Sequence, residues 1–299
     1  MKSIYDFILC HTPEFSVVSL CETLGVSTSA YYDYKNGKSY QDSAEKSKLK
    51  QEIKSIFEFH KKRYGSARIL ADLREKGFQI GLYRVRSIMK EEDLVAIQPK
   101  KFVPVTTQTH PHRRRSPNLL LNPLNWVDGP NQVIVGDITY LPVEASKGHY
   151  WLYMAVWTDL FSRRILGWCI DESMDESLII RAFQKVLKTR DLDTDLIVHT
   201  DGGGQYSSNN FRAILDRMNF HQSMTRKDNH YDNAHIESLF SRFKTEVFEE
   251  GIFISLEDAR FRTFEFIDGY YNTIRRHSGC GLISPDKFEE QYWSKFNNS

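Results

Sequence analysis

The chain has 299 residues, of which 40% are hydrophobic and 26% charged, a composition typical of a globular protein long enough for more than one domain. Four dispersed cysteines argue against a disulfide framework or a zinc ribbon, and no apolar run is long enough to suggest a membrane span. The net charge is +1, but residues 1–125 hold 21 Lys and Arg against 13 Asp and Glu, whereas residues 126–299 hold 19 against 26. We therefore expect a cytoplasmic protein whose front half binds a polyanion.

Residues 1–40 predict a helix-turn-helix-like segment. The stretch 14–35 contains a helix, a tight turn at Gly25, and a second helix capped by Ser27 or Thr28. The second helix interleaves aromatic residues with a base, at Tyr31, Tyr32, Tyr34 and Lys35. This pattern is typical of a helix in a DNA groove, although a small helical hairpin without DNA would also fit.

Residues 41–97 predict a second helical DNA-binding region. A charged helix over 42–62 is followed by a helix, a turn around Gly77 and Gly81, and a further helix that carries Arg84 and Arg86. On this last helix, three residues are available for the core: Val85, Ile88 and Met89. Two basic helical hairpins in series favour DNA binding.

Residues 98–125 read as a basic, proline-containing linker. Three consecutive bases, Arg113, Arg114 and Arg115, suggest that it follows a phosphate backbone, although solvated basic linkers are also common. A nearby His110-x-His112 pair has no further ligand in sequence, so we do not expect a metal there.

Residues 126–290 predict an α/β catalytic core, followed by a tail over 291–299. Three β-branched and aromatic runs at 131–143, 149–162 and 163–170 read as an antiparallel meander. Helices are expected at 175–190, 209–219 and 231–248, and strands at 195–200 and 220–225. This order describes a ribonuclease-H-like fold in which the first and fourth strands are neighbours.

Two aspartates fall on those neighbouring strands. Asp137 lies within the apolar first strand, and Asp201 ends the fourth strand in "IVHTDGGGQY". Carboxylates packed side by side repel each other unless a cation lies between them, and Mg²⁺ prefers such an oxygen-rich setting. The glycines after Asp201 are expected to leave the backbone open to metal and phosphate, because "DGGGQY" matches no nucleotide-binding glycine motif. His199 could orient a ligand or simply be a packed strand histidine.

A third acid, Glu237, lies on the last helix beside its apolar stripe. Asp232 or Asn233 is expected to cap this helix, and Lys244 lies about two turns beyond Glu237. Alone, Glu237 could be an ordinary exposed glutamate. Together with the two aspartates it could hold a pair of divalent ions, Mg²⁺ or Mn²⁺, for phosphoryl transfer without a side-chain nucleophile.

The chain resembles the second-frame (OrfB) transposases of the bacterial IS-three insertion-sequence family. Thirty-five residues separate Asp201 from Glu237, the spacing of the DDE motif in integrases and insertion-sequence transposases. The segments that carry the resemblance are "YGSARILADLREKGFQIG", "GDITY", "DLFSRRILGW", "HTDGGGQYSS", "YDNAHIESLFSRFKTE" and "YYNTIRRHSGCGLISPDKF".

This resemblance implies a ribonuclease-H-like (integrase) core, preceded by an all-α helix-turn-helix-type region. It implies that Asp137, Asp201 and Glu237 form the catalytic and metal-binding triad, for metal-dependent cleavage at inverted-repeat ends and 3′-OH transfer into double-stranded target DNA. It also implies DNA-phosphate contacts from Lys244, Lys227 and Arg226, and work at the bacterial nucleoid.

Synapsis of two DNA ends predicts a homo-oligomer. Family enzymes are commonly fused to an upstream-frame product that carries another helix-turn-helix and a leucine zipper. Because this chain opens with Met1 and shows no heptad repeat, we expect the catalytic half of such an assembly, fused with or bound to that product.

Two other functions fit parts of the sequence. A catalytically silent copy could act as a DNA-binding repressor of its own element, but the presence of all three acids counts against it. A plain metal-dependent nuclease would hydrolyse DNA and never join it, and the basic helical front half disfavours that alternative.

Overall fold

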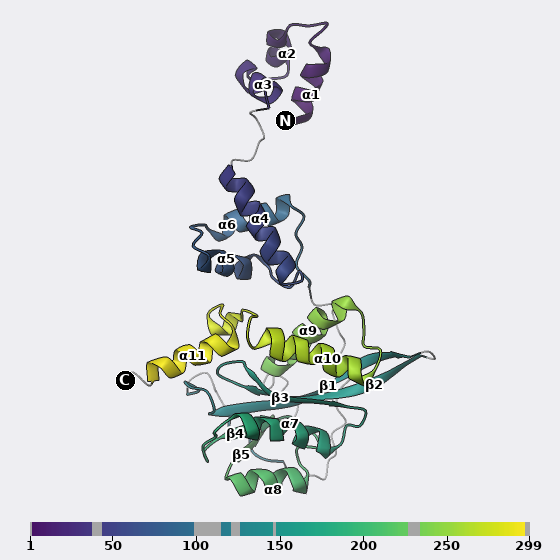
Figure 1. The fold of residues 1–299 in the computed structure, drawn as a ribbon, viewed down its shortest axis with the longest axis vertical. Helices are drawn as coiled ribbons and strands as arrows, with labels where there is room; N and C mark the ends of the chain where they lie inside the picture. The colour runs from purple at the N-terminus through teal and green to yellow at the C-terminus, as the bar shows by residue number, and fades with distance from the viewer. Residues whose placement is uncertain are drawn as a thin grey trace. The chain divides into compact units, whose positions relative to one another are not determined.

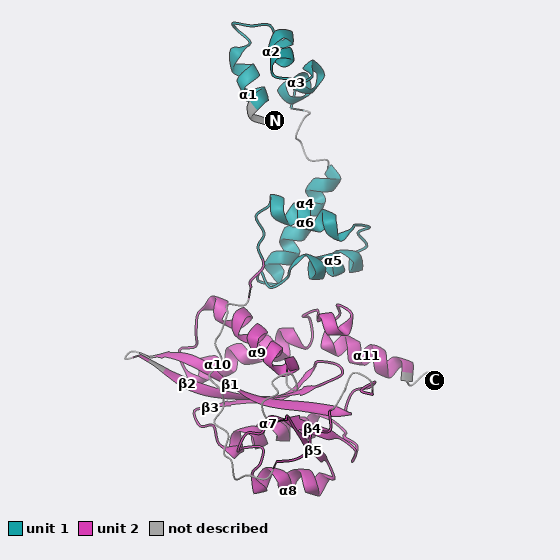
Figure 2. Cartoon of the chain, turned by 180° about the vertical axis from the view of Figure 1, so that it is seen from behind, with its two compact units in different colours: residues 1–95 teal, residues 96–299 magenta. Residues whose placement is uncertain are grey.

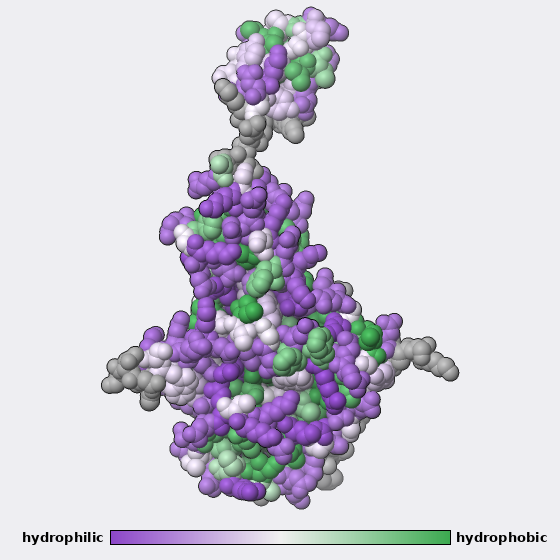
Figure 3. Space-filling model, in the orientation of Figure 1, coloured by the Kyte–Doolittle hydropathy of each residue, from purple (hydrophilic) through white to green (hydrophobic). Residues whose placement is uncertain are grey.

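The computed structural model describes residues 2–37, 44–98, 115–120, 126–145, 148–226 and 234–296. The chain divides into two compact units, residues 1–95 and residues 96–299 (Figure 2). On the face shown in Figure 3, the surface of both units is mainly hydrophilic, with hydrophobic residues in separate groups. No helix in the described ranges is both long enough and apolar enough to cross a membrane.

The first unit begins with three short helices that pack on one another (Figure 1). The expected helix-turn-helix is present as α2 (Val17–Thr23) and α3 (Thr28–Lys35), and α1 (Lys2–His11) precedes it without a counterpart in the prediction. Gly25 supplies the turn with a φ of 67°, and the Ser27 hydroxyl caps α3 by accepting a 3.1 Å hydrogen bond from the Ala30 N–H.

The tyrosines of α3 do not all face outward, which corrects part of the prediction. Tyr31 is completely buried in the core of the three helices, because α1 covers it. Tyr34 stacks on Tyr5 with ring centroids 5.3 Å apart and donates a hydrogen bond from its hydroxyl to Asp6. Tyr32 remains exposed. Two of the three rings therefore hold the helices together rather than lying on an open face.

The rest of the first unit contains α4 (Ala44–Phe59), α5 (Ser66–Glu75) and α6 (Leu82–Glu91), which pack together. Gly77 has a φ of 87° after α5, as a helix end requires. The core positions predicted for the last helix are buried: Val85, Ile88 and Met89. Arg84 and Arg86 are exposed, so the charge of α6 faces away from the core.

The second unit contains a five-stranded sheet of order β3-β2-β1-β4-β5. Its strands are β1 (Val133–Ala145), β2 (Gly148–Asp159), β3 (Ile165–Asp171), β4 (Ile197–Thr200) and β5 (His221–Met224). The first three form the predicted antiparallel meander, and β4 and β5 run parallel to β1. The expected adjacency of the first and fourth strands is confirmed.

Helices cover both faces of this sheet (Figure 1). On one face lie α7 (Glu176–Thr189) and α8 (Asn209–Met218), whose buried residues surround Trp157 of β2. The other face carries α9 (Ala234–Val247), η3 (Phe248–Glu250), α10 (Leu256–Phe266), the π-helical turn η4 (Ile267–Tyr271), η5 (Ser278–Cys280) and α11 (Pro285–Phe296). The ribonuclease-H-like core after an all-α region is therefore confirmed.

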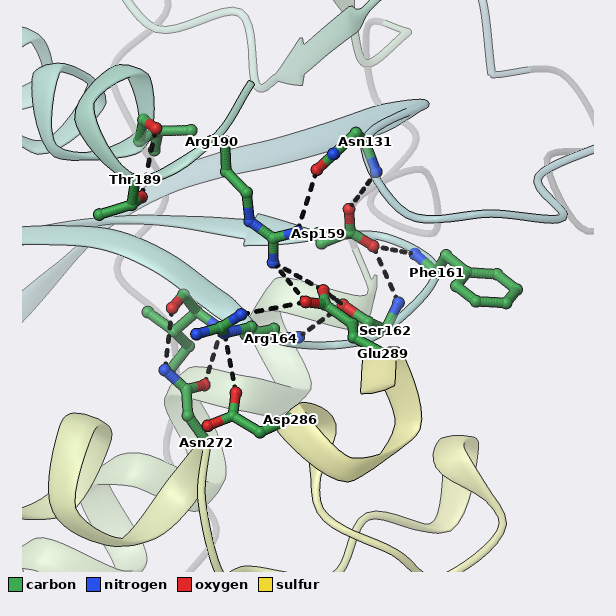
Figure 4. Close-up of polar contacts among 12 residues, drawn as sticks. Asn131, Asp159, Phe161, Ser162, Arg164, Thr189, Arg190, Asn272, Asp286 and Glu289 are labelled. Carbon is green, nitrogen blue, oxygen red and sulfur yellow. Dashed lines mark hydrogen bonds and ion pairs between the residues drawn. The ribbon is translucent and has the colours of Figure 1, made fainter. Parts of the chain in front are cut away.

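A buried polar network ties α11 to the sheet (Figure 4). Glu289 of α11 accepts hydrogen bonds from Arg190, at 2.6 and 2.7 Å, and from Arg164 at 3.1 Å. Asp159, at the end of β2, accepts from the backbone N–H groups of Asn131 and Ser162. These contacts fix the turn between β2 and β3 against α11, a helix that runs across the expected core boundary at residue 290.

Candidate active site

Asp137 occupies the middle of β1, where close packing holds the strand. Gly136 faces the ring of Trp157, and a Cβ on this glycine would come within 2.2 Å of that ring. The Trp157 indole N–H donates a 3.2 Å hydrogen bond to the Ile179 carbonyl, so β1, β2 and α7 are locked together here. Asp137 points to the opposite face from Gly136, because successive side chains alternate across a strand. The acid is thus held by a rigid strand.

Asp201 lies beside Asp137, as the sequence predicts. The parallel pairing of β1 and β4 ends at Gly136 and Thr200, and each aspartate is the next residue after this pair. Asp137 Oδ1 accepts a 2.8 Å hydrogen bond from the Ile138 N–H, and Asp201 Oδ1 accepts one of 2.9 Å from the Gly203 N–H. Among the described residues, no donor binds the Oδ2 atom of either carboxylate.

The two carboxylates disfavour each other's ionised form. Burial and the neighbouring Asp201 raise the pKa of Asp137 well above its usual range, and Glu237 adds to this effect. Burial also raises the pKa of Asp201, although the Gly203 N–H and the Arg115 guanidinium offset part of the change. A cation between the carboxylates would relieve this repulsion.

The glycines after Asp201 serve the protein's own side chains, which differs from the prediction of an open floor. A Cβ on Gly202 would come within 2.1 Å of the Arg115 guanidinium, so Arg115 lies directly over the loop. A Cβ on Gly203 would come within 2.8 Å of Asp201 Oδ1, the same oxygen that the Gly203 N–H binds. The missing side chains therefore leave room for Arg115 and for the Asp201 carboxylate.

Glu237 lies in the first turn of α9 and is exposed. The predicted stripe of this helix is buried against the sheet: Ile236, Leu239, Phe240, Phe243 and Val247. Glu237 is close enough to Asp137 to raise the pKa of that carboxyl, and Lys244 is close enough to lower it. Burial lowers the pKa of Lys244 itself to about 8, while Asp137 opposes this change. α9 thus places both an acid and a base near Asp137.

The other predicted DNA contacts are only partly described. The Arg115 guanidinium donates a 3.2 Å hydrogen bond to the Thr225 carbonyl, and Arg226 is exposed just after β5. Five other residues singled out from the sequence lie outside the described residues: Arg113, Arg114, Lys227, Asp232 and Asn233. The His110-x-His112 pair also lies outside them.

His199 is a packed strand histidine rather than a site residue. Its ring is fully buried in β4, and its Nδ1 lies 2.8 Å from the Ser223 hydroxyl of β5. The Ser223 hydroxyl also accepts a hydrogen bond from the Leu119 N–H at 2.9 Å. His199 thus joins β4 to β5 and to the segment before β1.

Tyr206 is the residue at this site that sequence reasoning did not single out. Its side chain is 1% exposed, and its pKa is raised well above the usual value by burial and by the charges of Asp137 and Asp201. Within the "IVHTDGGGQY" motif, the only available signal was a tyrosine five residues after an acid. Hydropathy does not distinguish a packed ring from a hydroxyl near carboxylates.

Family models match both units of the chain. An integrase core domain model matches residues 127–230, a second integrase core domain model matches residues 218–285, and an HTH-like domain model matches residues 44–102. The fold and these matches define the class of the protein, an integrase-type enzyme with a helical DNA-binding region.

Curated relatives extend the match over nearly the whole chain. The transposase InsF for insertion sequence IS3A of Escherichia coli (strain K12) is 37% identical over 291 residues, which covers 96% of this chain and 98% of the relative. The transposase for insertion sequence element IS904 of Lactococcus lactis subsp. lactis (strain IL1403) is 34% identical over 255 residues, covering 84% of this chain and 96% of that protein. The chain belongs to the IS3 family of insertion-sequence transposases.

The solved structures that match the chain are more distant. A simian T-cell lymphotropic virus intasome, in complex with a PP2A regulatory subunit, matches with a TM-score of 0.44 and 14% identity over 79% of this chain and 74% of that chain. The HTLV-2 integrase catalytic core domain in complex with magnesium matches with a TM-score of 0.39 and 15% identity over 54% of this chain and 97% of that chain.

The chain is therefore a DNA transposase with an integrase catalytic core, and the predicted family, fold and enzyme class are confirmed. An integrase core implies chemistry that depends on a divalent metal ion. In the part of the chain that the structure describes, no three His, Cys, Asp or Glu side chains converge closely enough to hold an ion as they stand. Two of the three predicted acids are brought together, and Glu237 lies near them but outward.

Proposed function

We propose that this transposase cleaves the ends of its insertion sequence and transfers the freed 3′-OH into DNA, with Asp137, Asp201 and Glu237 as the metal-binding triad. The observation that carries this proposal is the adjacent position of Asp137 and Asp201 at the end of the β1–β4 pairing. Both carboxylates have a raised pKa, which means that their ionised forms are destabilised in this position. A bound cation would stabilise those ionised forms.

The donors at this site fit a hard divalent ion. Two carboxylates lie at the end of the β1–β4 pairing, and Oδ2 of both aspartates is free of donors among the described residues. Mg²⁺ and Mn²⁺ favour such oxygen ligands, with phosphate and water completing the shell. We infer that two such ions bind, with Glu237 turning in from the first turn of α9 to complete the set.

The bound ions would supply activation of the attacking oxygen and stabilisation of the leaving 3′ oxygen. The protein's own residues would position the reaction. The Gly203 N–H orients the Asp201 carboxylate, and the Ile138 N–H orients that of Asp137. Lys244, whose pKa is lowered to about 8 but which is still largely charged at pH 7, would place a DNA phosphate beside Asp137.

We propose further DNA-phosphate contacts from Arg226, Lys227, Arg113, Arg114 and Arg115. For Arg115, the supporting observation is its position over Gly202, where a phosphate that approached Asp201 would meet a guanidinium. Replacing any one of these bases by alanine should weaken binding to all DNA sequences alike. It should also make the plot of the logarithm of the binding constant against the logarithm of the salt concentration less steep, by about one unit of slope.

The helical regions, residues 1–40 and 41–97, are proposed to bind the inverted-repeat ends, and the linker over 98–125 to pass along the backbone to the core at 126–290. The HTH-like domain match and the exposed Arg84 and Arg86 of α6 support DNA binding by the second region. An enzyme with this substrate is expected to work at the bacterial nucleoid.

Holding two DNA ends together requires more than one copy, so we propose a homo-oligomer that also joins with an upstream-frame product, by fusion or by binding. Light scattering of the protein with end-containing duplexes tests the first part. A dimer or larger species is expected, and a complex with one protein chain would contradict it.

The triad is tested by a strand-transfer assay on end-containing DNA and a target duplex with Mg²⁺. Asp137→Asn, Asp201→Asn and Glu237→Gln should each reduce joined product by at least about a hundredfold, because each would remove a ligand charge worth several kcal/mol in the transition state. Asp216→Asn changes an exposed acid of α8 and should leave joining unchanged. Joining by any of the three variants at the wild-type rate would remove that acid from the triad, and hydrolysis without joining would indicate a nuclease.

A further inference from the structure

Tyr206 carries a buried hydroxyl that has no hydrogen-bond partner among the described residues. The side chain is 1% exposed, so bulk solvent does not reach the hydroxyl. Burying an unsatisfied hydroxyl is costly, and a phenylalanine would fill the same space without that cost. The hydroxyl therefore calls for a role other than filling space in the core.

The ring of Tyr206 is fixed in place. It packs edge-on against Trp157, with centroids 5.8 Å apart, and against Phe211, with centroids 6.1 Å apart. The Tyr206 carbonyl accepts a 2.7 Å hydrogen bond from the Gln222 side chain. A ring held on this many sides cannot swing out to find a partner, so any partner must come to the hydroxyl.

The fixed ring lies against the carboxylate loop. A Cβ added to Gly203 would lie 2.8 Å from Asp201 Oδ1 and 3.5 Å from Tyr206 Cδ2. The Asp201 carboxylate and the Tyr206 ring therefore both lie next to Gly203. Trp157, which covers Gly136 next to Asp137, also touches Tyr206. The Tyr206 ring therefore lies against the Asp201 loop, and the charges of Asp137 and Asp201 are near enough to raise the pKa of its hydroxyl.

We propose that Tyr206 is a positioning residue of the active site, whose hydroxyl donates a hydrogen bond to the Asp137–Asp201 carboxylate pair when a divalent ion is bound there. This inference rests on the proposed metal site. The Oδ1 atoms of the two aspartates accept hydrogen bonds from backbone N–H groups. With an ion held by these carboxylates, the Tyr206 hydroxyl would hold their orientation. Groups that orient metal ligands in this way typically contribute about 10- to 100-fold to metal affinity or activity.

The test is a comparison of wild type and Tyr206→Phe by thermal unfolding and by calorimetric titration with MnCl₂ or MgCl₂ alone, without DNA. In metal-free buffer, Tyr206→Phe should melt at the same temperature as wild type or a few degrees higher, because an unsatisfied hydroxyl is removed. Its affinity for the metal should fall about 10- to 100-fold, and the rise in Tm on adding metal should shrink accordingly.

A matched control is Tyr31→Phe, which removes another completely buried hydroxyl with no hydrogen-bond partner among the described residues. This tyrosine belongs to the first unit, so its replacement should leave metal affinity unchanged. A Tyr206→Phe protein with the wild-type metal affinity would overturn the proposal. So would a clear loss of stability in metal-free buffer, because the hydroxyl would then have a partner in the absence of the ion.

Asp137→Asn separates this inference from the proposed site. Loss of metal binding in Asp137→Asn, with wild-type binding in Tyr206→Phe, would retain the metal site and reject only the role of Tyr206. Wild-type metal affinity in Asp137→Asn would instead reject the site itself, and the inference with it.

Discussion

At the scale of single residues, Gly136 shows how packing and chemistry meet on β1. The glycine lets the Trp157 ring lie against the backbone one residue before Asp137. Gly136→Ala should destabilise the core by about 1–3 kcal/mol, because the added methyl would force the ring or the strand to move. Urea denaturation of the full chain measures this change.

Gly269→Ala is the control for that substitution. Gly269 lies in η4, has an ordinary negative φ, and has no atom within 4 Å of the position where a Cβ would be added. The change should be neutral or stabilising by up to about 1 kcal/mol. Equal destabilisation by both alanines would mean that the contact with Trp157 is not what requires a glycine at position 136.

Asp137 gives the metal-free protein a pH dependence of known sign. The pKa of Asp137 in the folded protein is raised well above the value of about 3.9 expected in the unfolded chain. The contribution of this group to folding stability is therefore fully present below about pH 3.9, and it is lost as the pH rises through the raised pKa. Asp137→Asn removes that loss. The difference in unfolding free energy between Asp137→Asn and wild type should therefore grow as the pH rises above about 4 without metal, and shrink when Mg²⁺ is added.

Guanidine or urea titrations at several pH values check this expectation. A constant difference across the range would contradict it, since Asp137 would then have the same pKa in the folded and unfolded states. Asp159 and Asp286, whose pKa values burial also raises, contribute equally to both proteins and cancel in the comparison.

The sequence predicts the adjacency of Asp137 and Asp201 because hydrophobic periodicity places each on a strand and the strand order makes those strands neighbours. It does not predict that Arg115 lies over Gly202, because a contact between residues so far apart in the chain depends on where the linker returns to the sheet. The sequence does not predict the importance of the Tyr206 hydroxyl for a similar reason. Its missing partner is visible only once its surroundings are known.

At the scale of secondary-structure elements, α9 is held in place by a buried ion pair. Glu246, near the end of α9, accepts a 2.9 Å hydrogen bond from Arg275 Nε, and both side chains are almost fully buried. Glu246→Gln should cost about 3–5 kcal/mol, because it leaves the Arg275 guanidinium buried without a counter-charge. Glu246→Gln combined with Arg275→Met should cost less. A double substitution that costs the sum of the single ones would mean that the pair is not coupled.

The α11 network makes a second prediction at this scale. Glu289→Gln removes the charge that faces Arg190 and Arg164, and should destabilise the core by about 3 kcal/mol in thermal or urea unfolding. Glu290→Gln alters the exposed neighbour on the same helix and should change stability by less than about 0.5 kcal/mol. Similar effects for both would show that the buried network does not anchor α11.

The strands and helices from β1 to α9 are predictable because each has one buried face and polar breaks at its ends. α10 lacks that signal, because Phe261 and Phe264 lie exposed on its outer side and blur the contrast between its faces. α11 is hard to detect for another reason. Much of its attachment is the polar contact of Glu289, which reads in the sequence as surface charge.

At the scale of the whole molecule, the charge asymmetry of the sequence matches the two proposed roles, DNA binding by the front half and metal binding by the rear half. The excess of bases before residue 126 covers the helical unit and the linker, and the excess of acids after it includes the three residues proposed to hold metal. A basic unit attracts DNA over a distance of about 10 Å at moderate salt, whereas the acids need bound cations before they tolerate a phosphate.

If Asp137, Asp201 and Glu237 hold the catalytic ions, replacing one of these ligands should change which metal ion supports strand transfer. Strand transfer by Asp201→Cys should be measured in Mg²⁺ and in Mn²⁺, because Mn²⁺ accepts a sulfur ligand more readily than the hard Mg²⁺ ion does. Joined product should be reduced by at least about a hundredfold in Mg²⁺ and substantially recovered in Mn²⁺. Transfer in Mg²⁺ at the wild-type rate would contradict this expectation, since Asp201 could not then be a metal ligand.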